Sequence, residues 1–193
     1  MIGDANPDWT GSFANTLRYK NFALNFLIDV RQGGDIFSLD MYYGLATGLY
    51  PETAGLNDLG NPVRNTIADG GGFINKGETA DGKENTKRVD VSNLFGAYGY
   101  YRNPAKAFVY DASFVKLREV GLTYSFPKEF LGKSPVFKGV DVSVVGRNLW
   151  IIHKNLPYAD PEDIISSGNA ALGYQGGAYP AVRTFAFNVK LRF

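Results

Sequence analysis

The sequence has no cysteine and only one histidine among its 193 residues, and these two absences exclude most metal and nucleophile chemistry. Without cysteine there is no disulfide framework and no thiolate metal site. His153 has no second histidine with which to bind a metal, and it follows Trp150 and Ile151 near the end of an expected strand. We therefore interpret His153 as an interfacial residue rather than a base, and we expect no enzymatic activity, no cofactor and no metal.

The sequence also lacks a large excess of positive or negative charge, and it lacks long apolar runs. The net charge is +1 and no basic cluster stands out, so there is no electrostatic case for binding nucleic acid. No apolar run approaches the roughly 20 residues that a membrane helix needs. This criterion does not detect the strands of a transmembrane barrel, because their side chains alternate in polarity. Aromatic residues (15%) and 23 glycines are abundant, which favours β-structure with many turns.

The last ten residues alternate in polarity and end on an aromatic residue. The odd positions are apolar, with small or polar side chains between them: Phe185, Phe187, Val189, Leu191 and Phe193. A strand sends alternate side chains to opposite faces, so one face of this segment is wholly apolar. Such a strand suits either the core of a soluble sheet or the last strand of an outer-membrane barrel. This segment alone does not decide between the two.

Alternation of this kind predicts an all-β protein with antiparallel strands. We expect strands over residues 10–19, 21–31, 108–126, 139–153 and 184–193. The second of these has the clearest pattern, because the even positions from Phe22 to Val30 are all apolar. Asp29 and Arg31 lie on the opposite face, which is therefore expected to be wet.

The segment 108–126 is long for one strand, and its apolar residues change parity near Arg118 and Glu119. One extra residue in a strand shifts the facing of everything after it, so this change predicts a β-bulge. We interpret the segment as one bulged strand, because no turn residues separate the halves on either side of the bulge. Pro127 ends the strand, since proline cannot donate a ladder hydrogen bond.

The links between the expected strands alternate in length. The first two strands are joined by a tight turn and the third and fourth by residues 127–138, whereas residues 32–107 and 154–183 form long links. Transmembrane barrels have short periplasmic turns and long extracellular loops. All the links fit this alternation if the C-terminus lies on the periplasmic side. A compact soluble domain with so long an aperiodic loop would be unusual, so the links favour the barrel.

Five strands cannot close a barrel, because the smallest single-chain barrels use eight. An open edge in lipid would leave backbone groups without hydrogen bonds. We therefore expect this sequence to be the C-terminal part of a larger barrel, either as a natural truncation or as a partial gene. The alternative is a soluble β-sandwich that buries the same apolar faces between two sheets and presents an aromatic loop to a glycan.

The barrel interpretation assigns each side chain to lipid or to the lumen. The residues expected to face lipid are Phe22, Leu24, Phe26, Ile28, Val140, Val142, Val144 and the odd positions of 185–193. Those expected to face the lumen are Asn25, Asp29, Lys116, Arg118, Asp141, Ser143, Arg147, Asn188, Lys190 and Arg192.

Three tyrosines in the first long link are candidate contacts for a ligand or partner: Tyr98, Tyr100 and Tyr101. Exposed aromatic rings stack against flat partners such as sugar faces. The competing interpretation is that these rings pack within the loop or join the aromatic girdle of a barrel.

Two acidic segments have local interpretations. The run from Asp160 to Asp163 has the pattern of a helix N-terminus, with Asp160 as N-cap and Pro161 in the first turn. Residues 78–85 carry many oxygen atoms but lack the alternating acids and closing glutamate of a calcium loop, so we expect a solvated turn there.

Several phrases of the sequence resemble the SusC/RagA family of TonB-linked outer-membrane transporters. They are Asn6-Pro-Asp-Trp9, Arg18-Tyr-Lys-Asn-Phe22, Gly33-Gly-Asp-Ile-Phe37, Ala112-Ser-Phe-Val-Lys-Leu-Arg-Glu-Val-Gly-Leu-Thr-Tyr-Ser-Phe-Pro127, Gly146-Arg-Asn-Leu149, Asp160-Pro-Glu162 and Tyr179-Pro180. These phrases occur in the order of the family and cover nearly the whole sequence. The resemblance implies a 22-stranded barrel with an N-terminal plug. Residues 1–193 would hold the last five strands of that barrel and no plug domain.

The resemblance also implies a function for the parent protein, namely import of oligosaccharides or peptides across the outer membrane. Its implied partners are a TonB complex, reached through the missing N-terminal parts, and a SusD-like surface lipoprotein. The piece alone is not expected to transport. The family further implies that Phe193, with Leu191 and Val189, belongs to the C-terminal signal that the outer-membrane assembly machinery reads.

Overall fold

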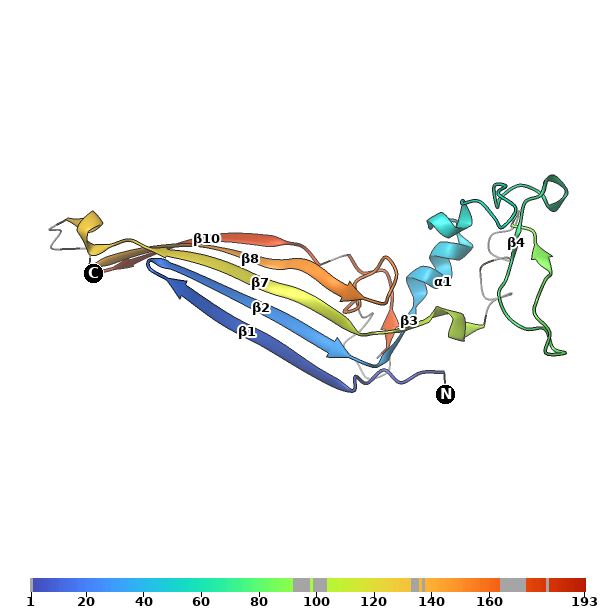
Figure 1. Ribbon diagram of the computed structural model, residues 1–193, viewed down its shortest axis with the longest axis horizontal. Helices are drawn as coiled ribbons and strands as arrows, with labels where there is room; N and C mark the ends of the chain where they lie inside the picture. The colour runs from blue at the N-terminus through green and yellow to red at the C-terminus, as the bar shows by residue number, and fades with distance from the viewer. Residues whose placement is uncertain are drawn as a thin grey trace.

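The computed structural model of the protein describes residues 2–91, 98, 104–132, 136, 138–163, 173–179 and 181–193. Its largest element is a five-stranded antiparallel sheet with the strand order β1-β2-β7-β8-β10. The strands are β1 (Trp9–Tyr19), β2 (Phe22–Gln32), β7 (Phe114–Ser125), β8 (Gly139–Lys154) and β10 (Thr184–Arg192). They form one long curved layer with β1 and β10 at its edges, which confirms the predicted all-β antiparallel class (Figure 1).

The links alternate between the two ends of this sheet. The β1–β2 turn, the β7–β8 link with the short helix η4 (Lys128–Leu131) and the C-terminus lie at one end (Figure 1). The two long links, residues 33–113 and 155–183, both leave from the other end. The sequence predicted this grouping of short and long links, because consecutive antiparallel strands return to opposite ends in turn.

One face of the sheet is apolar across its full width. The register aligns rows of side chains over all five strands, and the central row consists of Leu17, Leu24, Leu122, Val144 and Phe187. The next row towards the C-terminus is also apolar or aromatic: Tyr19, Phe22, Tyr124, Val142 and Val189. These side chains are not buried, and Phe187 is 79% exposed. An uncovered apolar surface of this extent marks contact with a membrane or another protein.

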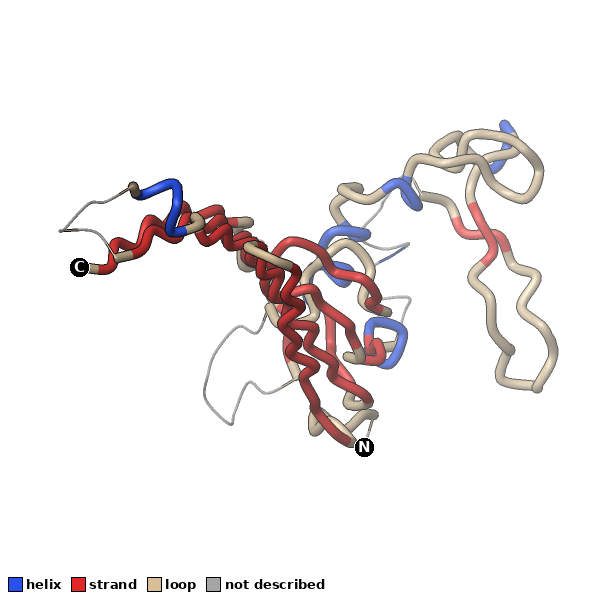
Figure 2. The backbone as a smooth tube through the Cα atoms, turned by 60° about the vertical axis from the view of Figure 1, so that its left-hand side comes forward, coloured by secondary structure: helices blue, strands red, loops and turns tan. Residues whose placement is uncertain are grey.

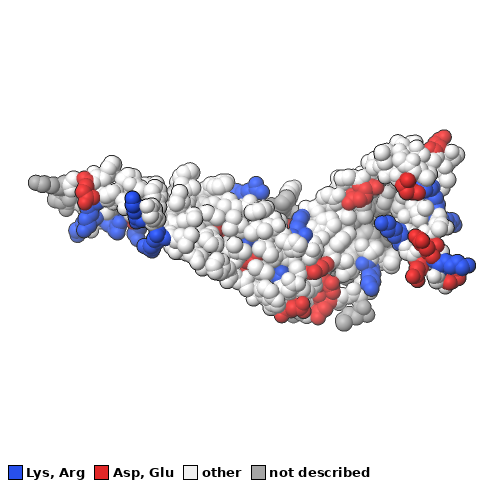
Figure 3. All heavy atoms as spheres, viewed as in Figure 1, with Lys and Arg blue, Asp and Glu red and all other residues white. Residues whose placement is uncertain are grey.

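The opposite face carries small and polar side chains. A row of the same register on this face consists of Arg18, Ala23, Thr123, Ser143 and Asn188. In the space-filling view, few charged side chains lie over the middle of the sheet, and most gather towards its ends and over the links (Figure 3). The two faces therefore differ in chemistry along every strand, as the alternation in the sequence predicted.

The β-bulge in β7 is confirmed. Leu117 pairs with Ile28 and Glu119 pairs with Leu27, which leaves Arg118 as the extra residue. The register with β8 shifts at the same place. The bulge restores the apolar face for the rest of the strand and frees the Arg118 side chain from the regular alternation.

The prediction of one continuous strand over residues 108–126 is wrong in its first part. Phe108 ends the short helix η3 (Ala105–Phe108), and β6 (Val109–Asp111) belongs to a different sheet from β7. The chain turns between these strands because the Ser113 backbone amide donates to the Asp111 carboxylate over 2.7 Å. The Ser113 hydroxyl in turn accepts from the Gly33 amide at 2.8 Å, which ties this turn to the end of β2.

The long links contain most of the compact packing. β3 (Asp35–Ser38) pairs with β6 and with β9 (Tyr174–Gln175), and α1 (Leu39–Ala46) follows β3 directly. The remaining elements are η1 (Pro51–Thr53), η2 (Ile67–Asp69), β4 (Phe73–Ile74) and β5 (Arg88–Val89). The β4–β5 pair stands well away from the main sheet (Figures 1 and 2).

The buried apolar side chains also lie in the links. One cluster contains Val63, Val89, Val91 and Tyr98, and a second contains Ile36, Ala112 and Leu156. Among the described residues, Phe114 is the only buried apolar residue that belongs to the main sheet. A β-sandwich would bury the apolar face of the sheet against a second sheet. In the described part of the chain that face stays open, which contradicts the soluble sandwich.

No helix in the described part of the chain is both long enough and apolar enough to cross a membrane.

Candidate functional site

An ionic cluster joins the polar face of the sheet to the segment that follows β8. Lys116 forms ion pairs with Asp160 and Glu162. The bulged Arg118 forms ion pairs with Glu162 and with Asp29 on the neighbouring strand, the latter at 2.7 Å. Five charged side chains from β2, β7 and the β8–β10 link therefore meet in one network.

This cluster is partly withdrawn from water. The Lys116 side chain is 6% exposed and that of Asp160 is 13% exposed. Ion pairs in such surroundings are stronger than pairs in water, and leaving one partner unpaired is correspondingly costly. Burial alone would raise the pKa of Glu162, but hydrogen bonds from Arg118 and Lys116 outweigh it and hold that pKa below its usual value.

The lowered pKa of Glu162 gives the cluster a defined pH dependence. A carboxylate with a depressed pKa stabilises the folded form above its usual pKa of 4.5, and this contribution is lost as the pH falls through the lower folded value. Glu162 is therefore expected to hold the segment 159–163 against the sheet at neutral pH and to release it in acid below pH 4.5. Hydrogen exchange of these amides, corrected for the intrinsic effect of pH on exchange, measures the release.

Glu162→Gln provides the control for this pH effect, because glutamine cannot ionise. The variant is expected to show weaker protection than the wild type at neutral pH and a smaller further loss in acid, because the pair between Lys116 and Asp160 remains. A wild-type protein whose protection falls with a midpoint above pH 4.5 would contradict the assignment to Glu162.

The segment that carries Asp160 is a turn in the part that the structure describes. The Glu162 amide donates to the Asp160 carboxylate at 2.9 Å, and the Asp163 amide donates to the Asp160 carbonyl at 3.0 Å. The predicted helix start at Asp160 is thus seen only as a capped turn as far as Asp163. Residues 164–172, over which a helix would continue, lie outside the described residues.

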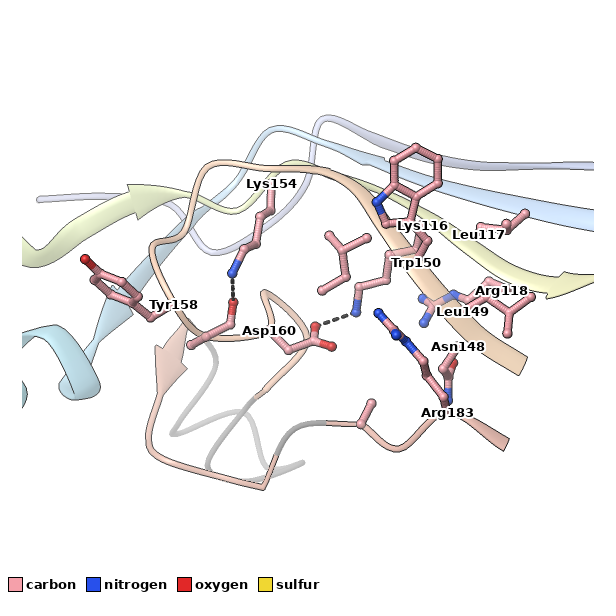
Figure 4. Close-up of a pocket in the computed structure, with 13 residues that line it drawn as sticks. Lys116, Leu117, Arg118, Asn148, Leu149, Trp150, Lys154, Tyr158, Asp160 and Arg183 are labelled. Carbon is pink, nitrogen blue, oxygen red and sulfur yellow. Dashed lines mark hydrogen bonds and ion pairs between the residues drawn. The ribbon is translucent and has the colours of Figure 1, made fainter. Parts of the chain in front are cut away.

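A cavity of about 160 Å³ lies beside this cluster, between β7, β8 and the residues that precede β10. Its polar lining includes four cations and one acid: Lys116, Arg118, Lys154, Arg183 and Asp160. Figure 4 shows the charged ends of Lys116, Arg118 and Arg183 converging on one side of this space, with Lys154 on the other side.

The walls of this cavity are held by contacts of two kinds. The Lys154 ammonium donates to the Ala159 carbonyl at 2.7 Å, which fixes the turn after β8 (Figure 4). Asn148, in the left-handed conformation with φ of 52°, donates from its side chain to the Val182 carbonyl at 3.3 Å. The second contact positions the backbone directly before Arg183.

A second cavity of about 160 Å³ adjoins the first and is acidic. It shares Tyr158, Ala159 and Asp160 with the first, and its other acids are Asp40 and Asp163. Gln175 bridges these two acids by donating to both of them. No group of three or more metal-ligating side chains suited to an ion occurs in the described part of the chain.

A pair of stacked tyrosines lines this acidic cavity. The rings of Tyr50 and Tyr158 lie 4.4 Å apart and 8° from parallel, and the Tyr158 hydroxyl donates to Glu52 at 2.9 Å. Gly44 of α1 lies against the Tyr50 ring so closely that an added Cβ would be 2.3 Å from it. The helix and the β8–β10 link are therefore connected through this ring.

Gly44→Ala is expected to move Tyr50 off Tyr158 and to destabilise α1 locally by about 1–3 kcal/mol, the usual cost of overpacking. In a helix without such a contact the same change would stabilise by up to about 1 kcal/mol. Hydrogen exchange of the α1 amides measures the effect. Adding Tyr50→Leu removes the clash and should recover α1, whereas equal protection in wild type and Gly44→Ala would refute the contact.

The tyrosines predicted to contact a ligand have different outcomes. Tyr98 is 7% exposed, stacks on Phe73 with ring centres 4.6 Å apart, and donates from its hydroxyl to the Glu52 carbonyl at 3.1 Å. This placement matches the competing interpretation of loop packing, and burial raises the pKa of Tyr98. Tyr100 and Tyr101 lie outside the described residues. Contact of these tyrosines with a ligand or partner stays a prediction.

The predicted assembly-signal residues Val189, Leu191 and Phe193 are all exposed. Their role in assembly stays a prediction, since no observation tests it. The structure does bring several of the predicted lumen residues together. Arg192 pairs with Asp141 at 2.9 Å, in addition to the pair between Asp29 and Arg118.

Sequence reasoning missed Lys154, Tyr158 and Arg183 as lining residues, and it missed Asp160 and Glu162 as partners of Lys116 and Arg118. A signal for the ion pairs was present. Two cations near the N-terminal end of β7 needed counter-charges, and the acidic run 160–163 begins soon after β8 returns to that end of the sheet.

The arrangement of strands resembles known import proteins of the outer membrane in fold. The structure of the RagAB peptide importer in its closed-closed state matches with a TM-score of 0.61 and 20% identity, over 97% of this chain and 17% of that chain. A structure of the RagAB peptide transporter matches with a TM-score of 0.55 and 19% identity, over 94% and 17% of the two chains. The fold is thus that of one part of such a protein.

Curated relatives point to the same class of protein. TonB-dependent receptor P3 of Formosa agariphila is 30% identical over the whole of this chain, and TonB-dependent receptor P26 of the same organism is 29% identical. No family model matches the chain. Over its whole length the chain is similar to one part of the TonB-dependent receptors, which agrees with the predicted family resemblance. It spans only 17% and 18% of the length of these two relatives.

Proposed function

We propose that this chain is part of the barrel wall of an outer-membrane importer, and that it supplies the last five strands of a TonB-dependent receptor. The observation that carries the proposal is the apolar face, which runs uncovered across all five strands and backs a polar face on the other side. Lipid on one side and a wet lumen on the other require this division.

The open edges of the sheet support its place in a larger barrel. β1 and β10 each pair on one side only. In lipid, unpaired backbone groups cost several kcal/mol each, so neighbouring strands from the rest of the receptor must satisfy these edges. The family resemblance puts the total at 22 strands. The chain is accordingly not competent for transport by itself.

The lengths of the links support one orientation of the sheet in the membrane. The long links 33–113 and 155–183 would lie outside the cell, and the β1–β2 turn, the β7–β8 link and the C-terminus would face the periplasm. Tyr100 and Tyr101 would then lie on the extracellular side.

The substrate and partners of the parent receptor are proposed from its relatives. RagAB is described as a peptide importer, which supports a peptide as the imported nutrient. The SusC/RagA resemblance implies an oligosaccharide as the alternative and a SusD-like surface lipoprotein as the partner. The TonB complex would act through parts of the receptor outside this chain. The relatives are receptors and transporters, which supports a role without enzymatic chemistry.

Paired cysteine labelling tests this proposal, because the chain has no cysteine of its own. Phe187→Cys and Asn188→Cys are introduced singly into the whole receptor, on a background without other accessible cysteines, and labelled in outer membranes. A lipid-soluble maleimide should react preferentially at position 187 and a water-soluble one at position 188. Equal reaction of both sites with the water-soluble reagent would refute the membrane wall.

A further inference from the structure

The cavity beside the ionic cluster has more positive charge than its own carboxylates neutralise. Four cations line it, and three carboxylates lie among or behind them when Asp29 and Glu162 are counted with Asp160. The net charge of this group is therefore +1. A partly enclosed space with this excess attracts anions.

The contacts show which cations are already engaged. Lys116 and Arg118 are bound by Asp29, Asp160 and Glu162. The Lys154 ammonium donates to a backbone carbonyl and pairs with no acid among the described residues. Arg183 has neither a hydrogen bond nor an ion pair from its side chain in the described part of the chain, yet it lines the cavity.

The position of Arg183 is built rather than incidental. Asn148 has a left-handed backbone conformation. Its side-chain amide donates to the Val182 carbonyl, which positions the backbone directly before Arg183. The Arg183 guanidinium points into the same space as the Lys116 ammonium and the Arg118 guanidinium (Figure 4). A guanidinium presents paired N–H donors that match the two oxygens of a carboxylate or the oxygens of a sulfate.

We infer that this cavity is a subsite for an anionic group, a carboxylate or a sulfate, on a small ligand, with Arg183 as its main contact. Leu149, Ile151 and Ala181 supply apolar walls beside the charged contact. A volume of about 160 Å³ accommodates one such group rather than a whole oligomer. The inference rests on the proposed function in one respect, that the polar face borders the path of the imported molecule.

The test uses the whole receptor purified in detergent and three matched probes, namely glucuronic acid, glucose 6-sulfate and glucose. Ligand-observed NMR measures the dissociation constants, because it detects weak binding. At least one of the two anionic sugars should bind more tightly than glucose. The comparison of glucuronic acid with glucose 6-sulfate distinguishes a carboxylate site from a sulfate site. Arg183→Gln is expected to weaken anion binding about tenfold, as loss of one charged hydrogen-bonding contact does.

Arg18→Gln is the matched control, because Arg18 lies on the same polar face near the opposite end of the sheet. It should leave anion binding unchanged. Equal binding of all three sugars, no anion binding by the wild type, or an equal loss in both variants would each overturn the inference. Cysteine labelling at positions 187 and 188 tests the membrane wall independently of anion binding. If the labelling pattern is as expected but anions do not bind, only the inference of the anion subsite is refuted.

Discussion

Phe187→Arg is expected to reduce assembly of the whole receptor severely, whereas Asn188→Arg, one residue further on, is expected to be tolerated. Position 187 lies in the central apolar row and is 79% exposed on the face that we assign to lipid. An arginine on the lipid face at mid-membrane costs about 2–4 kcal/mol, whereas lumen positions lack this penalty. The urea dependence of folding into liposomes measures the difference, and heat-modifiable mobility on gels reports the folded fraction.

A second pair on another strand controls for local effects in β10. Leu122 belongs to the same apolar row as Phe187, and its neighbour Thr123 belongs to the polar row. Leu122→Arg should therefore behave like Phe187→Arg, and Thr123→Arg like Asn188→Arg. If the polar-row variants are as damaging as the apolar-row variants, the assignment of faces is wrong.

Lys116→Met is expected to destabilise the attachment of the β8–β10 link to the sheet by about 3–5 kcal/mol, because it leaves Asp160 withdrawn from water without its cation. The Asp160 side chain is 13% exposed, so solvent screens little of this penalty. Unfolding of a large receptor is not a two-state process, and a local measurement is therefore appropriate. Hydrogen exchange of residues 154–163 gives the free energy of local opening.

The control for this prediction breaks an exposed ion pair on the same face. Arg192→Gln removes the pair with Asp141, in which the arginine side chain is 52% exposed, and exposed pairs contribute only about 0–1 kcal/mol. Lys116→Met combined with Asp160→Asn should recover part of the loss, because the unpaired charge is gone. Similar small effects in Lys116→Met and Arg192→Gln would contradict a strong cluster.

The main sheet could be predicted from the sequence because its surroundings impose a simple rule. Every strand must separate apolar from polar side chains, so the alternation from Phe22 to Val30 or from Phe185 to Phe193 indicates both the strand and its faces. The parity change at Arg118 likewise indicated the bulge, since one extra residue reverses the facing of all that follow.

The break after Asp111 was missed for a physical reason. Ala112 and Ser113 are neither glycine nor proline. The turn there is made by a hydrogen bond from the Ser113 backbone amide to the Asp111 carboxylate, which hydrophobic periodicity does not reveal. The site was missed because its contacts join distant segments. Lys116 and Asp160 are separated by 44 residues, and only the folded link brings them together.

The location of the apolar packing has a consequence for how the protein responds to its surroundings. The clusters around Val63 and Ile36 lie in the links, whereas the long strands contribute little to them. The links are held by the hydrophobic effect in water, as in an ordinary globular protein, whereas in the proposed barrel the sheet would be held by neighbouring strands and by lipid. A denaturant would therefore act mainly on the links, and a change of lipid thickness mainly on the sheet. The stability of the links and that of the sheet can thus be changed separately.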